Sequence, residues 1–301
     1  LLDVLVHGRG MTLTNGNALA GRLAKAAMDL DIDVWLSSPL VDLVTEGDKV
    51  TGAIVKHEDK SIEIHVRQGV VLACGGFPHD ILRRKQLFPH APTGKEHFTP
   101  SPTANTGDGL KIAEKVGGWV DTTIPNAAAW CPTSVVPRKD GTFGVMPHFI
   151  DRAKPGVIAV TANGERFTNE ALSYHDFVQD WVKACQVREQ KEIFAWLICD
   201  HKHLREYGLG AAAPFPFPIG RHLRSGYLKC GETIQELATK IGVPADVMQK
   251  QIAWFNEDAS VGIDRQFGKG STAYNRYQGD ALVKPNPCMA PITHGPFYAI
   301  R

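Results

Sequence analysis

The sequence predicts an α/β fold in which a β-meander feeds into a parallel sheet, followed by a second region of α+β type. A helix-periodic stretch at 15–30 precedes a short apolar run at 33–36. Glycine and acidic turns then divide residues 40–67 into three strand-like segments. Beyond residue 150, apolar strand-like runs alternate with longer helical stretches, and the sequence shows no repeat or heptad pattern.

The elements of the first region follow from local patterns. A helix at 15–30 carries its leucines on one face, with Asn15 or Asn17 as the expected N-cap. Residues 33–36 are expected to form a short buried strand. The meander strands are expected at 40–45, 50–57 and 61–67. Residues 70–73 are apolar throughout and end at a glycine pair, which is typical of a strand buried on both faces.

A glycine turn leads next into a helix expected at about 110–116, which two glycines end. The second region is expected to begin within the proline-containing stretch 132–147. Its first elements are expected to be a strand–turn–strand unit at 156–167, a helix at 173–190 and an apolar strand at 193–200. A capping box at 233–236 and Pro244 are expected to open two further helices.

Composition excludes several classes of protein. The 301 residues are 43% hydrophobic and 22% charged, as is ordinary for a globular protein. A net charge of +1 gives no electrostatic reason to bind nucleic acid or an anionic membrane, and no apolar run approaches the roughly 18 residues of an integral membrane segment. Six single cysteines favour reduced thiols and a cytoplasmic location. Asp200, His201 and His203 lack a further suitably spaced ligand, so no metal site is predicted.

Two glycine motifs have the composition of cofactor-binding loops. Gly75 and Gly76 follow an apolar run, where a missing Cβ lets the backbone pass close to a ligand. The next helix opens with a TGDG turn, made of Thr106, Gly107, Asp108 and Gly109. Its backbone N–H groups can face a ligand, and its carboxylate can accept hydrogen bonds from ribose or ribityl hydroxyls. Each motif alone is more simply a tight turn or a capped helix, but their succession is specific.

Taken in order, these motifs resemble the FAD-dependent oxidoreductase family that includes the flavoproteins of fumarate reductase and succinate dehydrogenase and the 3-ketosteroid dehydrogenases. The matching segments are GNALAGRLAKAA, GVVLACGGF, TGDG, NGERFTNE and GPFYA. The resemblance implies a dinucleotide (FAD)-binding domain interrupted by an inserted capping domain. Residues 1–136 are then the middle part of the FAD-binding domain, 137–289 the capping, substrate-binding domain, and 290–301 a return strand into the FAD-binding domain.

The resemblance also implies cofactor contacts. The family's TGDG aspartate contacts FAD, which gives this role to Asp108, and Leu40 is expected to contact the adenine end through its backbone. The family's GxGxxG fingerprint and its C-terminal FAD segment are missing from the sequence, which starts without methionine and ends in a strand-like run. We therefore expect the sequence to be part of a longer polypeptide, and the fragment alone to hold FAD weakly.

Tyr174 and Cys131 separate this chain from the diacid reductases that it resembles. Fumarate reductases place an arginine four residues beyond the glutamate of NGERFTNE, where a guanidinium protonates the substrate and helps to neutralise its carboxylates. That position is Tyr174 here. The reductases also have a histidine before Pro-Thr at the entrance to the capping domain, and here that position is Cys131. Because neither replacement is cationic, a dianion would be bound poorly.

The 3-ketosteroid dehydrogenases resemble this chain at Tyr174 and also in AYNRYQGD and KPNPCMAPITHGPFYA. The resemblance implies that Tyr174 is the acid/base that exchanges a proton alpha to a ketone, a role open to a phenol whose pKa a neighbour lowers. His175 could be that neighbour or an ordinary surface residue, and Tyr174 itself could be a packed residue at a helix start. Asn169, Glu170 and Cys131 are the predicted substrate-loop residues, and Glu170 is expected mainly to fix the loop by hydrogen bonding to the backbone or to Arg166, and only secondarily to serve the substrate.

The sequence therefore predicts a flavoprotein oxidoreductase, similar to 3-ketosteroid dehydrogenase, that adds or removes hydrogen across a C–C bond beside a ketone. Hydride moves to or from flavin N5 in this reaction. The expected partners are FAD, a bulky apolar ketone or enone, and an electron acceptor that the sequence does not identify. Two alternatives stay open: a diacid reductase similar to fumarate reductase, and a non-catalytic fragment that is only a structural unit.

Overall fold

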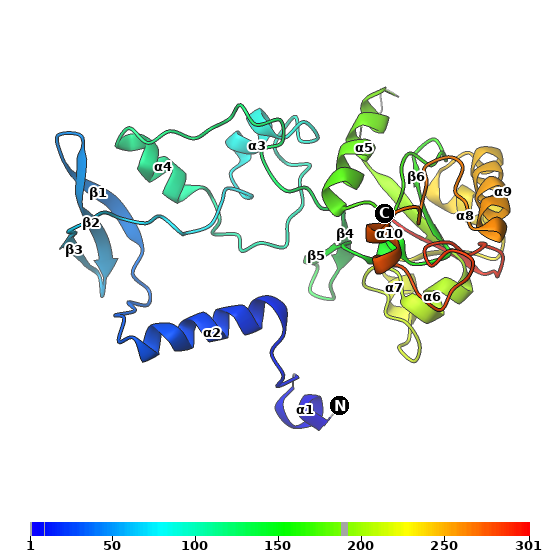
Figure 1. Ribbon diagram of the computed structural model, residues 1–301, viewed down its shortest axis with the longest axis horizontal. Helices are drawn as coiled ribbons and strands as arrows, with labels where there is room; N and C mark the ends of the chain where they lie inside the picture. The colour runs from blue at the N-terminus through cyan, green and yellow to red at the C-terminus, as the bar shows by residue number, and fades with distance from the viewer. Residues whose placement is uncertain (1, 9, 188–191) are drawn as a thin grey trace. The chain divides into compact units, whose positions relative to one another are not determined.

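The computed structural model describes residues 2–8, 10–187 and 192–301, and these form two compact units (Figure 1). The first unit comprises Leu1–Ala73 and Gly109–Trp119, and the second comprises Cys74–Asp108 and Val120–Arg301. The loop that carries the glycine pair therefore belongs to the same unit as the predicted capping region.

A three-stranded antiparallel meander organises the first unit. Its strands are β1 (Leu40–Glu46), β2 (Lys49–His57) and β3 (Lys60–His65), in the order β1-β2-β3. Leu43 lies opposite Ala53, and Val55 lies opposite Ile62. The predicted strands at 40–45, 50–57 and 61–67 are confirmed, with ends that differ by no more than two residues.

Three helices accompany the meander. They are α1 (Leu2–His7), α2 (Asn15–Asp29) and α4 (Asp108–Lys115). Helix α2 confirms the helix predicted at 15–30, but the predicted asparagine cap is wrong, because Thr14 is the N-cap and Asn15 has a φ of 50°. No residue of α2 is buried. Helix α4 confirms the helix predicted near 110–116.

The two short strands predicted in this region are wrong. Residues 33–36 and 70–73 have no strand structure, and Val34 and Val71 are 64% and 90% exposed. A strand buried on both faces needs hydrogen-bonded neighbours, and within the described ranges no strand pairs with either segment. The apolar composition is present, but the described chain supplies no partner that could turn it into a sheet.

A four-stranded antiparallel sheet forms the centre of the second unit. Its strands, in the order β6-β7-β9-β8, are β6 (Val157–Thr161), β7 (Ala195–Cys199), β9 (Phe297–Ile300) and β8 (Lys229–Gly231). Alternate residues of β6 enter different cores, as the pleat requires. Ile158 and Val160 pack in a cluster with α8 and α9, whereas Val157 and Ala159 pack in a cluster with α5 and α6. Both faces of the sheet are therefore covered.

The helices of this unit agree with most of the predicted signals. They are α5 (Tyr174–Val187), α6 (His201–Tyr207), α7 (Gly220–Arg224), α8 (Ile234–Ile241), α9 (Ala245–Val261) and α10 (Ala273–Gln278), with a 3₁₀ turn η1 (Asp151–Ala153). Helix α5 confirms the helix predicted at 173–190, of which 188–190 lie outside the described residues. Thr233 caps α8 by accepting a hydrogen bond from Glu236 N at 3.1 Å, as the capping box predicts. The return strand of the unit predicted at 156–167 is reduced to one bridge, between Val160 and Arg166.

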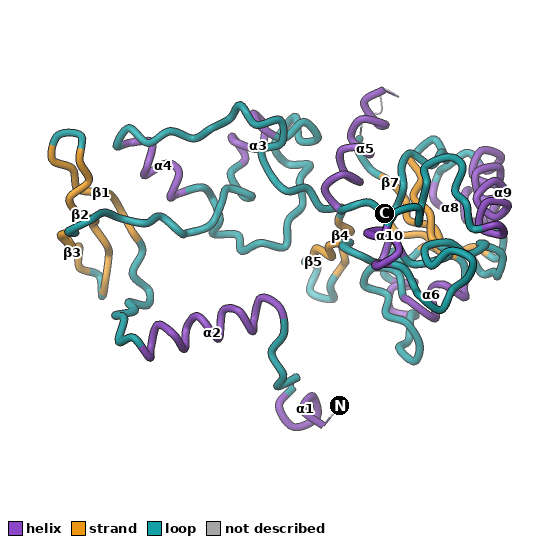
Figure 2. Tube along the Cα trace, viewed as in Figure 1, coloured by secondary structure: helices purple, strands orange, loops and turns teal. Residues whose placement is uncertain are grey.

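Long loops join β3 to the hairpin of β4 (Thr133–Pro137) and β5 (Phe143–Pro147), as Figure 2 shows. Besides α4, this stretch contains α3 (Ile81–Leu87), which Asp80 caps by accepting hydrogen bonds from two backbone N–H groups. The division into 1–136, 137–289 and 290–301 stays a prediction. Within the second unit, β9 links the last of these segments to the sheet.

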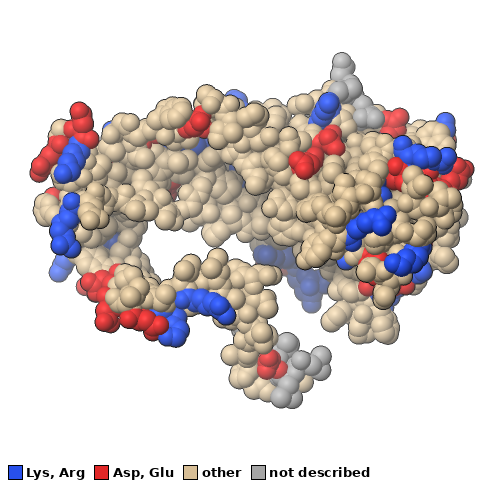
Figure 3. All heavy atoms as spheres, viewed as in Figure 1, with Lys and Arg blue, Asp and Glu red and all other residues tan. Residues whose placement is uncertain are grey.

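Charged side chains of both signs lie close together on the face drawn in Figure 3. Ion pairs of the same kind occur within helices, and in α8 Lys240 and Glu236 form an exposed ion pair at 2.6 Å. Local compensation of this kind agrees with the net charge of +1. In the part of the chain that the structure describes, no helix combines the length and apolar character needed to span a membrane.

Candidate active site

Within the second unit, the structure brings the glycine pair together with the Thr106–Asp108 part of the TGDG turn. The His79 backbone N–H donates a hydrogen bond to the Asn105 carbonyl at 3.0 Å. Gly75 has a φ of 88°, and a Cβ at that position would lie 3.0 Å from Asn105 Oδ1. Gly107 has a φ of 75°, and its Cβ would lie 3.0 Å from Phe77 Cβ. Both positions therefore need glycine, because of the left-handed backbone and because of the close approach.

Helix α4 starts directly beyond this contact. Asp108 is exposed in its first turn, and its carboxylate accepts a hydrogen bond from Thr106 Oγ1 at 2.9 Å. Gly109, the first residue of this turn to belong to the first unit, is buried, and Gly76 of the second unit is exposed. A close-packed glycine turn, a helix start and an exposed carboxylate are groups that suit the phosphates and hydroxyls of a dinucleotide. The residues present thus fit FAD, although their individual contacts stay predictions, as does that of Leu40 at the start of β1.

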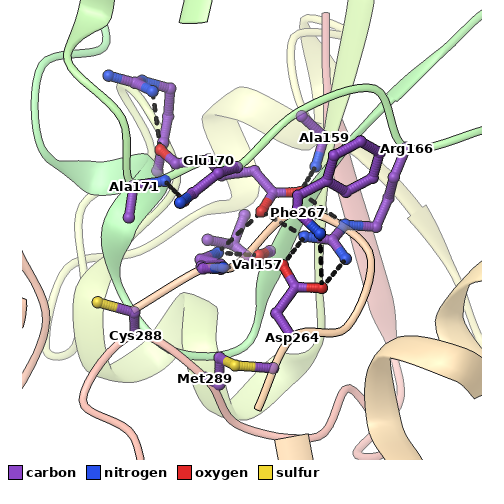
Figure 4. A network of polar contacts seen from close by, with 12 residues as sticks. Val157, Ala159, Arg166, Glu170, Ala171, Asp264, Phe267, Cys288 and Met289 are labelled. Carbon is purple, nitrogen blue, oxygen red and sulfur yellow. Dashed lines mark hydrogen bonds and ion pairs between the residues drawn. The ribbon is translucent and has the colours of Figure 1, made fainter. Parts of the chain in front are cut away.

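Glu170 lies at the centre of a buried ionic network (Figure 4). Arg166 donates from Nε and Nη2 to its two carboxylate oxygens, each at 2.9 Å. The same guanidinium donates to Asp264 at 3.1 and 3.0 Å. Lys269 Nζ lies 3.4 Å from Glu170 Oε2 and donates to the Val157 carbonyl at 2.7 Å. The side chains of all four ionic residues are 0% exposed.

The two cations and two anions of this network compensate one another. Burial opposes ionisation of Glu170, but the charges of Arg166 and Lys269 outweigh it and lower the pKa of the carboxyl group. Burial likewise opposes ionisation of Asp264, and the hydrogen bonds and charge of Arg166 lower its pKa. Burial lowers the pKa of Lys269, against the attraction of Glu170. Glu170 also accepts a hydrogen bond from the Ala159 N–H at 3.0 Å, so it holds the loop to β6.

Asn169 fixes the same loop from its other side. Its Nδ2 donates to the Gly268 carbonyl at 3.1 Å and to Asn275 Oδ1 at 2.9 Å, and its Oδ1 accepts from the Ala171 N–H at 2.9 Å. The residue is only 7% exposed. Both residues of the predicted substrate loop are thus bonded to the protein, and any direct contact with substrate stays a prediction.

Tyr174 is the first residue of α5. Its ring packs edge-on against Phe149, with the centroids 5.4 Å apart, and the residue is 37% exposed. Among the described residues, the Tyr174 hydroxyl has no hydrogen-bond partner. The phenol is therefore supported through its ring, and its hydroxyl is bonded to no described residue.

A buried arginine holds the segments on both sides of this ring. Arg152 donates from Nε to the His148 carbonyl and from Nη2 to the Phe149 carbonyl, both at 3.0 Å. It also donates to the carbonyls of Glu170, at 2.8 Å, and Leu172, at 3.4 Å. Because one guanidinium binds both segments, the position of Phe149 is fixed relative to the start of α5.

His175 connects the start of α5 to the segment that ends at Cys131. The Trp130 backbone N–H donates to His175 Nδ1 at 3.0 Å. One helical turn further on, Gln179 Oε1 accepts a hydrogen bond from Asn126 Nδ2 at 3.3 Å. Asn126 Oδ1 in turn accepts from the Trp130 indole N–H at 3.0 Å. The helix that carries the predicted base and the segment that carries Cys131 thus form one bonded assembly.

Cys131 is a neutral group at physiological pH. Burial raises the pKa of its thiol to about 11. The Sγ atom lies 3.5 Å from the Pro132 carbonyl oxygen, to which it can donate weakly. This position therefore supplies no charge with which to hold an anion.

A cavity of 1180 Å³ lies beside Cys131. Its aromatic lining residues are His90, His97, Phe98, Trp130, Trp181, Phe194, Trp196 and Tyr227. His90 Nε2 and His97 Nδ1 are 3.0 Å apart, and burial lowers the pKa of His90 to about 4 and that of His97 to about 3. Both imidazoles are thus neutral at pH 7. Tyr174 does not line this cavity, so the structure does not place the predicted base and the cavity in one site.

Ser134, His148 and Asp151 have the atoms of a hydrolytic triad but not its accessibility. His148 lies 2.5 Å from Asp151 Oδ2 through Nδ1 and 2.9 Å from Ser134 Oγ through Nε2. Ser134 is 1% exposed, and its oxygen also lies 2.7 Å from the Tyr227 hydroxyl. A nucleophile must reach its substrate, and this serine cannot. The chain of hydrogen bonds instead ties β4 to the segment before η1.

The acidic and histidine cluster near residue 200 is bonded to the protein. Asp200 caps α6 by accepting from the His203 N–H at 2.9 Å, and its other oxygen accepts from the backbone of Thr293 and His294. His203 Nδ1 lies 2.7 Å from the Pro155 carbonyl oxygen. Over the described ranges, no group of three His, Cys, Asp or Glu side chains could hold a metal ion.

Sequence reasoning missed several of the groups that position the site. Asp264 and Lys269 lie about a hundred positions from Arg166 and Glu170, and no local pattern links them. Arg152 could have been noticed in the sequence, because this charged residue lies shortly before the apolar run 157–161. The carbonyl groups that it binds could not have been predicted.

Comparison with known proteins identifies relatives over the whole chain. The family model described as FAD binding domain matches residues 1–301. A 4-oxocyclohex-2-ene-1-carboxylate 5-dehydrogenase of Sinomonas cyclohexanicum is 40% identical over an aligned length of 301 residues, and the match covers 99% of this chain and 50% of that protein. A 3-oxosteroid 1-dehydrogenase of Mycobacterium tuberculosis is 35% identical over 303 residues, covering 95% of this chain and 51% of the relative.

A solved structure has the same fold. The crystal structure of 3-ketosteroid delta1-dehydrogenase from Sterolibacterium denitrificans, in complex with 1,4-androstadiene-3,17-dione, is similar with a TM-score of 0.84 and 34% identity. The match covers 95% of this chain and 51% of that one. The chain thus spans about half the length of the relatives it matches, and the similarity confirms the predicted α/β FAD-binding fold.

Proposed function

This chain belongs to the FAD binding domain family, and on that premise we propose that the whole protein is a flavoprotein oxidoreductase acting on a C–C bond beside a ketone. The observation that carries this proposal is the start of α5. It presents the Tyr174 phenol, packed by its ring and free at its hydroxyl, where a diacid reductase would present a guanidinium. The similar proteins from Sinomonas and Mycobacterium, named as dehydrogenases of ring ketones, support the same chemistry.

The substrate that we propose is a bulky, largely apolar ketone or enone. Cys131 is a neutral thiol, and Tyr174 carries no positive charge when its hydroxyl is protonated. Phe149, which packs against the Tyr174 ring, and the adjoining Ile150 are 49% and 56% exposed and add apolar surface beside the phenol. Such a surface suits an apolar ring better than a pair of carboxylates, which would lose hydration without gaining ionic partners.

FAD, when bound, supplies the acceptor or donor of hydride. Its binding is proposed to involve the TGDG turn, with Asp108, and the facing Gly75–Gly76 backbone, which the structure packs against one another. The chain's own task is then to orient the substrate ring and to move one proton. In dehydrogenation, the Tyr174 phenolate, formed by loss of its hydroxyl proton to solvent, takes the proton from the carbon alpha to the ketone and becomes the phenol; in reduction, the phenol returns a proton to that carbon and becomes the phenolate.

The rigid parts of the site explain how a single phenol could do this. Arg152 fixes Phe149 against α5, and the network around Glu170 fixes the loop that leads into the helix. A general base must be held within hydrogen-bond reach of the proton that it abstracts. We therefore assign Asn169, Glu170 and Arg152 positioning roles, and Tyr174 the catalytic role.

The experiment that tests this proposal replaces Tyr174 in the flavin-loaded whole protein. Tyr174→Phe retains the ring that packs against Phe149 but removes the hydroxyl. We expect turnover of a 3-ketosteroid to fall by about a hundred- to ten-thousand-fold with flavin content unchanged, and exchange of the alpha hydrogen with deuterated water to stop. Near-normal turnover by Tyr174→Phe would show that the tyrosine is structural.

Two alternatives predict different results for the whole protein, one in turnover and one in flavin absorbance. A diacid reductase similar to fumarate reductase would turn over fumarate with a reduced dye at a rate comparable with that for cyclic enones. A purely structural protein would carry no flavin absorbance band after purification of the whole protein. We also propose a cytoplasmic location, on the basis of six cysteines that form no disulfide, and an electron acceptor whose identity would come from dye and quinone screening.

A further inference from the structure

We propose that His175 and Gln179 are positioning residues that hold the Tyr174 phenol in its reactive orientation through the segment 126–130. We call the four bonded residues His175, Gln179, Asn126 and Trp130 the α5 latch. The proposal rests on the catalytic role proposed above for Tyr174. It assigns to two further side chains of α5 a function in the same reaction, without contact with the reacting atoms.

The first ground is the geometry of α5. His175 and Gln179 are four residues apart, so they lie on one face of the helix, one turn apart. His175 Nδ1 accepts from the Trp130 backbone N–H at 3.0 Å, and Gln179 Oε1 accepts from Asn126 Nδ2 at 3.3 Å. The Trp130 indole N–H closes the arrangement by donating to Asn126 Oδ1 at 3.0 Å. Two successive turns of α5 are therefore attached to one short segment, which limits rotation of the helix about its axis.

The second ground is that the other side of the latch is rigid. Trp130 is 4% exposed, so its two N–H donors have little access to water. Its ring packs edge-on against Phe88 at 4.8 Å and against His90 at 4.9 Å. Phe88 is itself 4% exposed and ends α3 as its C-cap. The latch thus fastens the start of α5 to a packed aromatic cluster rather than to a loose loop.

The same cluster leads to the predicted cofactor loops. Helix α3 runs from its N-cap Asp80 to Phe88, and a Cβ on Gly107 would lie 3.5 Å from Asp80 Oδ2. The TGDG turn is therefore packed on the start of α3, and the latch is packed on its end. This continuity, which runs within the second unit, relates the position of Tyr174 to the glycine pair and to the Thr106–Asp108 part of the turn that we propose for FAD.

The hydrogen bond to Trp130 also fixes the chemical form of His175. Because Nδ1 accepts a hydrogen bond, this nitrogen carries no proton. The ring proton of the neutral imidazole therefore lies on Nε2. A cationic His175 could not keep this bond, so the latch assigns the residue a role other than that of a positive charge beside a phenolate. The same requirement makes the proposal sensitive to the choice of substitution. An asparagine amide oxygen can take the place of Nδ1, whereas a glutamine amide extends toward the place of Nε2.

The test compares three replacements of His175 in the flavin-loaded whole protein, with a 3-ketosteroid as the probe. We expect His175→Ala to lower kcat by about ten- to a hundred-fold, as a displacement of roughly 1 Å does, while KM and flavin content change little. His175→Asn should recover most of the lost kcat, and His175→Gln should not. Gln179→Leu should give a smaller loss in the same direction. Lys183→Ala, on the exposed part of α5, serves as the matched control and should leave kcat unchanged.

A double-mutant cycle separates positioning from general stability. If the latch acts through Tyr174, the double variant Tyr174→Phe/His175→Ala should be no slower than Tyr174→Phe alone, because the group that was positioned is already absent. Multiplied losses in the double variant, or equal kcat for His175→Ala and the unaltered protein, would overturn the latch. A fully active Tyr174→Phe enzyme would overturn the proposed function and the latch with it, whereas an inactive Tyr174→Phe beside a fully active His175→Ala would overturn the latch alone.

Discussion

Lys25–Asp29 in α2 and Arg166–Glu170 after β6 are ion pairs with the same spacing in the sequence and opposite surroundings. The side chains of the first pair are 73% and 59% exposed, and those of the second are both 0% exposed. An exposed pair exchanges hydration for a weak, screened attraction. A buried pair must instead be completed by further partners, and here Asp264 and Lys269 complete it. Sequence spacing identifies the pair in both units, but its energetic importance depends on what surrounds it.

The apolar faces of the two units differ in the same way. Leu23 in α2 and Leu237 in α8 both lie on helices with apolar residues at helical spacing, yet the first is 61% exposed and the second is 0% exposed. Helix α8 packs on the four-stranded sheet, whereas no residue of α2 is buried. A local pattern is thus enough to predict a helix, and burial depends on a partner that the pattern does not contain.

The sharpest test of this comparison is removal of one anion from each pair. Glu170→Gln should lower the free energy of unfolding by about 3–5 kcal/mol, because it leaves Arg166 and Lys269 buried with one anion fewer. The matched change in the first unit, Asp29→Asn, should be within error. Urea unfolding of the whole protein, with separate probes for the two units, gives both values. Equal effects of the two substitutions would break the comparison.

Truncation of the two leucines should give the next largest contrast. Leu237→Ala removes a fully buried side chain and should destabilise the second unit by about 2–5 kcal/mol. Leu23→Ala retains good helix propensity and removes a side chain that is mostly exposed, so its effect should be small. Thermal unfolding monitored by circular dichroism measures both changes. A large loss from Leu23→Ala in the whole protein would show that α2 packs there against further residues.

Acid should weaken the second unit through its network. The pKa values of Glu170 and Asp264 lie below their ordinary values of 4.5 and 3.8, because Arg166 outweighs the effect of burial. The unfolded chain therefore binds protons at a higher pH than the folded chain does. The stabilisation is fully present above about pH 4.5 and is lost as the pH falls through the lowered folded values. Urea midpoints measured between pH 7 and pH 2 should decline less steeply in Glu170→Gln, and an equal decline would contradict the assignment.

The smallest predicted contrast concerns two thiols of the second unit. Cys74 is exposed, whereas burial raises the pKa of Cys131 to about 11. Alkylation proceeds through the thiolate, so at pH 7 iodoacetamide should modify Cys74 first and Cys131 slowly. The rate at Cys131 should keep rising until the pH approaches 11. Mass spectrometry of Cys74→Ser and Cys131→Ser variants assigns the two rates, and fast modification of Cys131 at pH 7 would contradict its predicted neutral state.

The sequence was sufficient for elements whose signal is local. The meander at 40–67 is divided by turns that the chain itself encodes, and the TGDG turn opens α4 as expected. The strands predicted at 33–36 and 70–73 failed because apolar composition does not supply hydrogen-bond partners. Short apolar segments such as 33–36 and 70–73 form strands only where a neighbouring strand pairs with their backbone N–H and C=O groups.

The sequence allowed individual residues of the site to be predicted, but not the contacts between residues that are distant in the chain. Tyr174 could be singled out because a resemblance identifies the position, and the link from Glu170 to Arg166 because they are near in sequence. His175 could be named only as a neighbour. Its hydrogen bond to Trp130 joins residues 45 positions apart, and nothing in either segment encodes the meeting. Long-range contacts of this kind depend on the packing of whole elements.

The place of β9 in the sheet has a consequence for the making of the protein. Residues 297–300 pair with β7 on one side and with β8 on the other, although they follow both by tens of residues in the chain. During synthesis on the ribosome, β7 and β8 therefore each keep an edge without its β9 partner until Ile300 has left the exit tunnel. The sheet closes only after that point, and a chain released earlier would expose two strand edges to other nascent chains.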